Sequence, residues 1–196
     1  MRSFPLFSTH LDLAHEYMHR LLKEGDWAID ATCGNGHDTL ELTRILHKKG
    51  CVIGIDVQHD AIVKTRTLLE SQFSKEDLCN VSLFCQSHAD FPQICFQNPI
   101  RLVVYNLGYL PGGNKRLTTL TESTLESVRQ ALKLIMPGGG VLITCYPGHA
   151  EGAKEEKALQ EELSTLSPMQ YNICVHTFIN RTSSPSLLLI QNNLQF

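Results

Sequence analysis

The chain has 196 residues, of which 42% are hydrophobic and 19% are charged. This composition supplies enough apolar side chains for a buried core and excludes intrinsic disorder, which requires low hydrophobicity and a high net charge. The net charge of -3, from 17 basic and 20 acidic residues, excludes a protein that coats nucleic acid with a broad basic surface. A small basic patch remains compatible with this balance.

The seven cysteines include no C-x-x-C pair. Their odd number and their positions in apolar stretches favour reduced structural thiols over a disulfide framework or a zinc site, so we expect a cytoplasmic protein without a metal. The N-terminal segment reaches His10 and Asp12 before an apolar stretch develops. No apolar run approaches the roughly 18 residues of a membrane helix. We therefore expect neither a secretory signal nor contact with a membrane.

Helix and strand patterns alternate along the chain. In chain order they are a helix over about 11–22, a strand over 27–31, a helix over 39–48, a strand over 51–56, a helix over 61–69, strands over 81–85 and 102–105, a helix over 121–135, a strand over 141–145 after a glycine turn at 138–140, a helix over 151–166, and strands over 172–179 and 187–191. Apolar strands separated by helices predict a parallel sheet covered on both faces. The last two strands predict a hairpin that adds one antiparallel strand at an edge.

The predicted fold is therefore α/β: a Rossmann-like, doubly wound, seven-stranded and mostly parallel sheet with an antiparallel C-terminal hairpin strand. We expect residues 1–196 to form a single domain, with residues 1–25 as an N-terminal helix region packed on it.

Three features lie at the carboxyl ends of the predicted strands, where open α/β sheets bind ligands. The first strand ends at Asp30 and runs into a turn with glycines at 34 and 36, which permit close approach of a ligand. Asp56 ends the second strand, 20 residues beyond Gly36, a distance at which an acidic side chain binds ribose hydroxyls. Ser87 and His88 follow the third strand. Singly, each feature has a structural explanation, such as a tight turn or a helix cap; together they predict a nucleotide site.

The identity of the nucleotide follows from the form of the glycine turn. A dinucleotide fingerprint would have a third glycine where Thr39 stands, and no P-loop motif occurs. The D-x-x-x-G-x-G pattern at residues 30–36 instead resembles the first motif of class I S-adenosylmethionine (SAM) methyltransferases. This resemblance implies SAM as the cofactor. The implied cofactor-binding residues are Thr32, Gly34, Asn35, Gly36, Asp38, Asp56, Gln58, Ser87, His88 and Asn106.

The loop after the fourth strand, Y-N-L-G-Y-L-P-G-G-N-K at residues 105–115, occupies the position that faces the transferred methyl group in such enzymes. Those that methylate planar amines often carry N-P-P-Y there. This chain keeps Asn106 and Tyr109 at the same spacing but has Leu107 and Gly108 in place of the prolines. An amine acceptor is favoured, and it need not be planar. The structural alternative is a glycine-rich loop that only reverses the chain.

Three segments together resemble one specific family: the loop just described, Y-P-G-H at residues 146–149 and D-A-T-C-G-N-G-H-D-T at residues 30–39. It is the family of tRNA 5-aminomethyl-2-thiouridine methyltransferases, formerly described as rRNA methylases. The resemblance implies N-methylation of 5-aminomethyl-(2-thio)uridine at the tRNA wobble position, giving the methylaminomethyl form. The family usually has Asp where Asn114 stands, and N-x-P-P where this chain has S-S-P-S at residues 183–186.

The predicted chemistry is attack of a neutral amine on a methyl carbon. Asn106 and Tyr109 are the residues expected to orient the amine, and His149 is a candidate general base because its intrinsic pKa lies near neutrality. His149 is equally consistent with a helix cap. Lys115 and Arg116 are candidates for contacts with anticodon-loop phosphates, although a solvated pair is a common alternative. The expected substrate-binding residues are Tyr109, Pro111, Gly112, Lys115, Arg116 and Tyr146.

Two alternatives are also consistent with these motifs. The first is an rRNA or small-molecule amine methyltransferase with the same donor. The second is a non-catalytic SAM-binding module. The expected partner is the anticodon loop of tRNA, and the protein is expected to be a monomer or homodimer. His10, His15 and His19 follow one another along the first predicted helix, and we interpret them as structural or as surface residues near the substrate.

Overall fold

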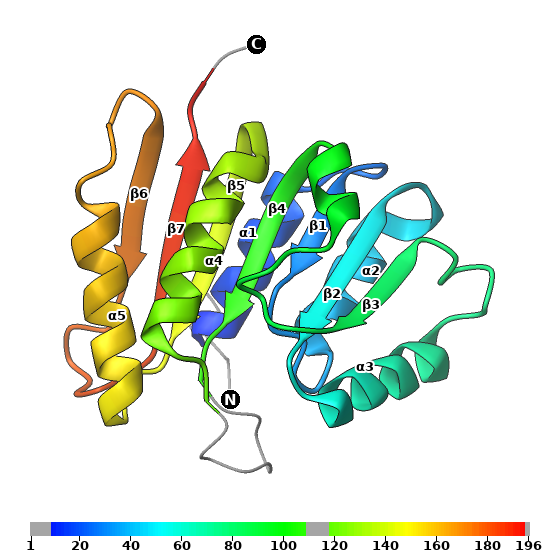
Figure 1. The fold of residues 1–196 in the computed structure, drawn as a ribbon, viewed down its shortest axis with the longest axis horizontal. Coiled ribbons are helices and arrows are strands. Elements are labelled where there is room, and N and C mark those ends of the chain that lie inside the picture. Colours follow the sequence, from blue (N-terminus) through cyan, green and yellow to red (C-terminus); the bar gives the residue numbers. More distant parts are fainter. Residues whose placement is uncertain (1–8, 109–117, 195–196) are drawn as a thin grey trace, which may run out of the picture.

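The computed structural model describes residues 9–108 and 118–194. The helices and strands are α1 (His10–Leu21), β1 (Trp27–Asp30), α2 (His37–Leu46), η2 (His47–Lys49), β2 (Cys51–Asp56), α3 (His59–Gln72), β3 (Val81–Cys85), η3 (Gln93–Gln97), β4 (Ile100–Asn106), α4 (Thr121–Leu134), β5 (Ile135–Cys145), α5 (Ala150–Leu163), β6 (Tyr171–His176) and β7 (Ser186–Asn192). They form one seven-stranded sheet between two layers of helices (Figure 1).

The strand order is β3-β2-β1-β4-β5-β7-β6, with β1 to β5 parallel and β7 antiparallel to both of its neighbours. This confirms the predicted fold class. One detail of the prediction was wrong: the antiparallel strand is not at the edge. β7 lies between β5 and β6, and its burial explains this position, because most of its side chains pack into the two cores while β6 is largely exposed.

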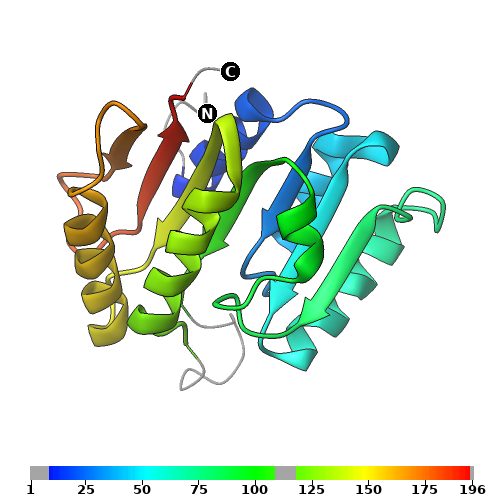
Figure 2. The same ribbon diagram turned by 45° about the horizontal axis from the view of Figure 1, so that its top comes forward.

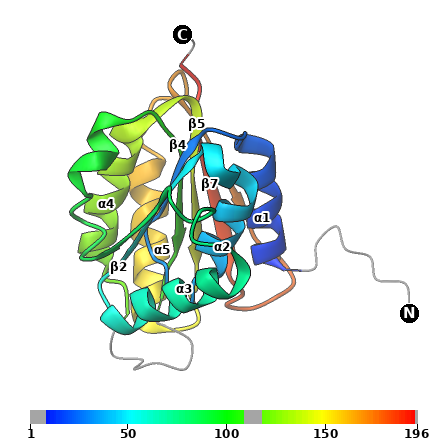
Figure 3. The same ribbon diagram turned by 90° about the vertical axis from the view of Figure 1, so that its right-hand side faces the viewer.

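Each face of the sheet has its own apolar core. On one face, Met18 of α1 and Leu42 of α2 pack against β4 and β5, and both side chains are fully buried. On the other face, Val128 of α4 and Leu159 of α5 close a second core. Figure 3 shows α1 and α2 on one side of the sheet and α4 and α5 on the other. In Figure 2, α4 and α5 lie side by side in front of the strands.

The fifth strand is longer than its sequence predicts. Residues 138–140 were predicted to form a turn, but they are part of β5, and Gly140 pairs with Leu102 of β4. The backbones approach closely here: a Cβ atom on Gly139 would lie 2.7 Å from the carbonyl oxygen of Arg101. The glycines therefore let two strands pack past a shift in register rather than reverse the chain.

Within the described residues, no helix has the length and apolar character needed to cross a bilayer. All seven cysteines are unpaired. Cys33, Cys95 and Cys145 are buried, whereas Cys79, Cys85 and Cys174 are exposed, so fewer of the thiols are structural than the sequence indicates.

Candidate active site

The glycine turn connects β1 to α2 at the carboxyl edge of the sheet. Gly34 and Gly36 have positive φ angles of 54° and 85°. A Cβ atom on Gly36 would lie 2.8 Å from the Cα atom of Thr65 in α3, so only glycine fits this position. The turn leads directly into the first residues of α2, whose free backbone N–H groups favour a negatively charged ligand group.

Asp56 links this turn to the end of β2. One carboxylate oxygen accepts a hydrogen bond from the backbone N–H of Gly34 at 2.9 Å, and the other accepts from the N–H of Gln58 at 2.8 Å. The N-cap of α3 is Gln58, so Asp56 does not cap that helix. Each carboxylate oxygen can accept a further hydrogen bond, and the half-buried side chain is therefore able to bind two ribose hydroxyls.

Asp30 and Thr39 form a buried support beneath the turn. The Asp30 carboxylate is fully buried and accepts from the Thr39 hydroxyl at 2.5 Å and from the Thr32 N–H at 3.1 Å. Burial raises the pKa of Asp30, and the nearby Asp38 carboxylate raises this pKa further. Thr39 stands where a dinucleotide fingerprint has glycine, and its side chain is needed here as the hydrogen-bond donor.

Thr32, Asp38 and Asn106 come from three different segments and meet beside the turn. The backbone N–H of Asn106, at the end of β4, donates to the Thr32 hydroxyl at 2.7 Å. The Asn106 side-chain amide donates to one carboxylate oxygen of Asp38 at 3.1 Å. The structure thus brings together three of the residues predicted to bind the cofactor, and it fixes the orientation of the Asn106 side chain.

Helix α1 supplies two further side chains that the sequence did not assign to the site. The His15 Nε2 atom lies 2.8 Å from the second oxygen of Asp38, and this hydrogen bond raises the pKa of His15. The His10 Nε2 atom lies 3.1 Å from the hydroxyl of Tyr146, with the two rings edge-on at 5.4 Å. Burial raises the pKa of Tyr146 to about 12.

The contacts of His88 and His149 indicate structural roles for both side chains. The His88 ring is buried edge-on against Tyr105 at 6.0 Å, and burial lowers its pKa to about 4. Ser87, beside it, is exposed at the sheet edge.

His149 is the N-cap of α5, and its Nδ1 atom accepts from the Gly152 N–H at 3.1 Å. Because this cap uses the Nδ1 lone pair, the capping interpretation of His149 is preferred over that of a general base.

Five of the predicted substrate-binding residues lie outside the described residues: Tyr109, Pro111, Gly112, Lys115 and Arg116. The residues on either side of this segment are described. The Gly108 N–H donates to the Thr119 hydroxyl at 2.9 Å, and the Thr119 N–H donates to the Gly108 carbonyl at 3.0 Å. The Thr119 hydroxyl in turn donates to the buried Glu155 carboxylate of α5 at 2.9 Å.

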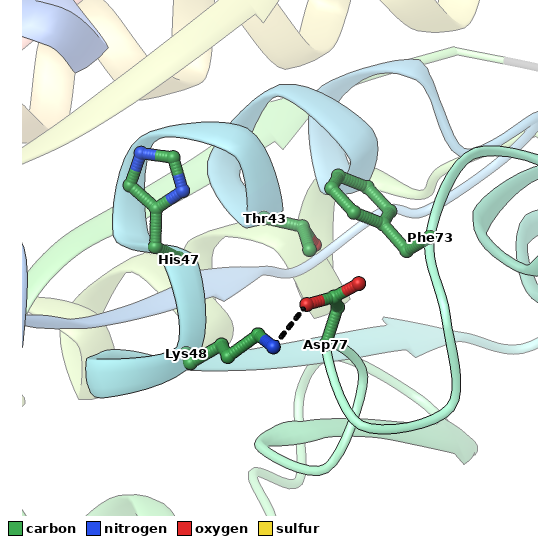
Figure 4. Close-up of a pocket in the computed structure, with 5 residues that line it drawn as sticks. All are labelled: Thr43, His47, Lys48, Phe73 and Asp77. Carbon is green, nitrogen blue, oxygen red and sulfur yellow. Dashed lines mark ion pairs between the residues drawn. The ribbon is translucent and has the colours of Figure 1, made fainter.

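A small cavity of about 70 Å³ lies far from these residues, at the other end of α2. Its lining residues are Thr43, His47, Lys48, Phe73 and Asp77 (Figure 4). Lys48 forms an ion pair with Asp77 at 2.9 Å. Because α2 begins at the glycine turn and ends here, this cavity lies at the amino ends of the strands, and we assign it no part in ligand binding.

Comparison with known proteins assigns the chain to a family. Residues 52–192 match the family described as "Putative rRNA methylase". A curated relative from Arabidopsis thaliana, a chloroplastic tRNA (mnm5s2U34)-methyltransferase, is 37% identical over 186 residues, which cover 91% of this chain and 68% of the relative.

Solved structures agree with this match. A Clostridium thermocellum protein with the same rRNA-methylase description is 31% identical and covers 93% of this chain and 96% of its own, with a TM-score of 0.86. A methyltransferase from Streptococcus mutans, described as putative and solved with S-adenosylhomocysteine, is 28% identical and covers 95% of this chain and 99% of its own, with a TM-score of 0.81. The chain therefore belongs to the rRNA-methylase family of class I SAM-dependent methyltransferases.

Proposed function

We propose that the protein transfers a methyl group from SAM to the amine of 5-aminomethyl-(2-thio)uridine at the wobble position of tRNA. The observation that carries this proposal is the position of Asn106. Its side chain is held between the glycine turn and Tyr146, at the end of β4, by a 3.1 Å hydrogen bond to Asp38. The name of the 37% identical relative supports the choice of substrate.

The residues at the carboxyl edge suit the donor. Gly34 and Gly36 form the tight turn that the donor would approach, and Asp56 offers carboxylate oxygens beside this turn. Thr32, Gly34, Asn35, Asp38, Gln58 and Ser87 complete the proposed donor site, while the buried His88 would contribute its backbone and the shape of its ring. SAM supplies an electrophilic methyl group on a sulfonium sulfur. The protein must place the amine in line with the bond that breaks, within about 3–3.5 Å of the methyl carbon.

The acceptor nitrogen must carry a free lone pair. A primary alkyl amine is mostly protonated near neutral pH, so the site has to accept one of its protons. The Asn106 amide nitrogen donates to Asp38, which leaves the Asn106 carbonyl oxygen available as an acceptor for an amine N–H. We assign Asn106 to orientation of the amine. Tyr109, Pro111 and Gly112 are proposed to enclose the base, and Lys115 and Arg116 to contact phosphates.

The second candidate substrate is rRNA, which the description of the matching family favours. A small-molecule amine and a binding module without activity are the remaining alternatives. Asn106 is hydrogen-bonded to Thr32 and Asp38, and this argues against a binding module that has lost its activity. Substrate and product analysis therefore has to separate tRNA from rRNA directly.

We also propose that residues 1–196 act as one domain, in the cytoplasm, as a monomer or homodimer. The seven unpaired cysteines support a reducing compartment. Gel filtration with light scattering would measure the oligomeric state.

The test of the function is a methyl-transfer assay on bulk tRNA and on rRNA from cells that lack the final wobble methylation. Purified protein and SAM are added, and the digested nucleosides are analysed by mass spectrometry. We expect 5-aminomethyl-2-thiouridine to gain the mass of one methylene group, with no change in rRNA. Methylation of rRNA alone would contradict the proposal, and so would donor binding without methylation of either RNA.

A further inference from the structure

Helix α1 brings a titratable side chain to the proposed methyl-transfer site from the opposite end of the sequence. His10 is the first residue of α1, and its Nε2 atom lies 3.1 Å from the Tyr146 hydroxyl. Tyr146 follows β5 and borders the end of the β4 loop, because a Cβ atom on Gly108 would lie 3.8 Å from the Tyr146 ring. Burial raises the pKa of Tyr146 and a hydrogen bond with the Asn106 side chain partly opposes this, so the Tyr146 hydroxyl lies beside Asn106.

The titratable groups around His10 come from three elements. Among the described residues these are Asp12 on α1, Asp38 on α2 and the Tyr146 hydroxyl after β5. Burial lowers the pKa of His10, while Asp12 and Asp38 oppose this effect. The imidazole is therefore neutral near pH 7, and two carboxylates are near enough to stabilise the imidazolium once it forms.

We propose that His10, acting through the Tyr146 hydroxyl, accepts the proton that the substrate ammonium loses before methyl transfer. This inference rests on the proposed function. The ammonium N–H bond breaks and its proton passes to the Tyr146 oxygen, while the Tyr146 proton passes to Nε2 of His10. The products are a neutral amine, an intact tyrosine and an imidazolium. The amine lone pair then forms the new N–C bond as the C–S bond of SAM breaks, and the electron pair of that bond stays on sulfur.

The other candidate bases near the site already have partners. Asp38 already orients two side chains, since one of its oxygens contacts His15 and the other accepts from Asn106, so a proton placed there would compete with the contact that holds Asn106. The Nδ1 atom of His149 caps α5. Asp30 is fully buried under the turn and bonded to Thr39. Tyr146 does not act alone, since its pKa of about 12 keeps it protonated near neutral pH; it serves as a relay to His10.

The test is the pH dependence of single-turnover methyl transfer to tRNA carrying 5-aminomethyl-2-thiouridine, with saturating SAM. The variants are His10→Gln, which removes the acceptor, and Tyr146→Phe, which keeps the ring and removes the relay. The control is His19→Gln, an exposed position on the same helix that pairs with Glu41. Donor affinity is measured for each protein by calorimetry.

We expect both variants to lose about 100-fold in rate near neutral pH, a typical contribution of general base catalysis, with donor affinity and the control unchanged. The loss should shrink to less than about 10-fold two pH units higher, because the amine then loses its proton to solvent. A loss of the same size at every pH, or no loss in Tyr146→Phe, would overturn the inference. A wild-type protein that methylates none of this tRNA would instead contradict the proposed function.

Discussion

Gly108 and Thr119 are joined by two hydrogen bonds across the ends of the segment predicted to bind substrate. The Gly108 N–H donates to the Thr119 hydroxyl at 2.9 Å, and the Thr119 N–H donates to the Gly108 carbonyl at 3.0 Å. The Thr119 hydroxyl also donates to Glu155, a buried carboxylate that accepts a second hydroxyl from Thr124 at 2.6 Å. Helix α5 therefore helps to hold Gly108 and Thr119 together.

Replacement of Thr119 by Val should weaken RNA binding and leave donor binding unchanged. Valine keeps the shape but leaves the Gly108 N–H and one Glu155 oxygen without this partner, at a cost of about 1–3 kcal/mol. We expect KM for tRNA to rise by roughly 10-fold or more, which corresponds to about 1.4 kcal/mol. Steady-state kinetics measure this change in KM. Thr67→Val, on the exposed face of α3, is the matched control. An unchanged KM would show that the hydrogen bonds between Gly108 and Thr119 do not contribute to RNA binding.

Replacement of Asp56 by Ala should weaken donor binding. The carboxylate is the proposed ribose acceptor and also holds the Gly34 N–H. Hydrogen bonds to charged groups contribute about 1.5–3 kcal/mol, so the Kd for SAM should rise roughly 10- to 100-fold. Calorimetry measures this directly. Asp60→Ala, at an exposed position in the first turn of α3, should bind SAM like the wild type. A Kd that does not change in Asp56→Ala would remove Asp56 from the donor site.

Replacement of Asn106 by Ala separates binding from chemistry. The side chain is proposed to orient the amine, so its removal should lower kcat by about 100-fold or more, while the Kd for SAM changes by less than about threefold. Asn172→Ala, on the exposed strand β6, provides the control. If Asn106→Ala keeps its turnover, the assignment of the reaction centre is wrong.

The ion pair between His15 and Asp38 should make stability depend on pH. Its hydrogen bond raises the pKa of His15 above the ordinary value of 6.5. A raised pKa in the folded state adds stability that is complete below the unfolded pKa and is lost as the pH rises through the folded pKa. The free energy of unfolding of the wild type should therefore exceed that of His15→Gln most below pH 6.5.

Urea unfolding of both proteins from about pH 6 to about pH 9 measures this difference. The difference should shrink steadily as the pH rises. The same comparison is made in protein that carries Asp38→Asn. Because the carboxylate is absent there, His15→Gln should no longer change how the free energy of unfolding depends on pH. A difference between wild type and His15→Gln that is constant with pH would contradict this account of the pair.

The strands were largely predictable because their signals are local. The bounds of β2 and β3 follow from short apolar runs that end at polar residues, and the sequence predicts both as observed. The beginning of β5 was not predictable in this way. Its glycines resemble a turn locally, and only pairing with β4 makes them a strand.

The same distinction applies to the site. Asp56 and Asn106 could be identified because strand ends place them at the ligand edge of any such sheet. The roles of His10 and His15 depend on how α1 packs. His10 meets Tyr146, which is 136 residues away in the sequence, and no local pattern encodes that contact. His149 shows the reverse case, since a residue that suits general base catalysis by type is used as a helix cap.

The amine acceptor is the central claim, and it is tested most directly by comparing anticodon stem-loops that differ only at the wobble base. One carries 5-aminomethyl-2-thiouridine, one carries 5-hydroxymethyl-2-thiouridine and one carries 2-thiouridine. Each is incubated with the protein and SAM, and methyl incorporation is read by mass spectrometry of the digested nucleosides. The account predicts a methyl group on the amine of the first RNA and none on the other two. Methylation of either RNA that lacks the amine would contradict it.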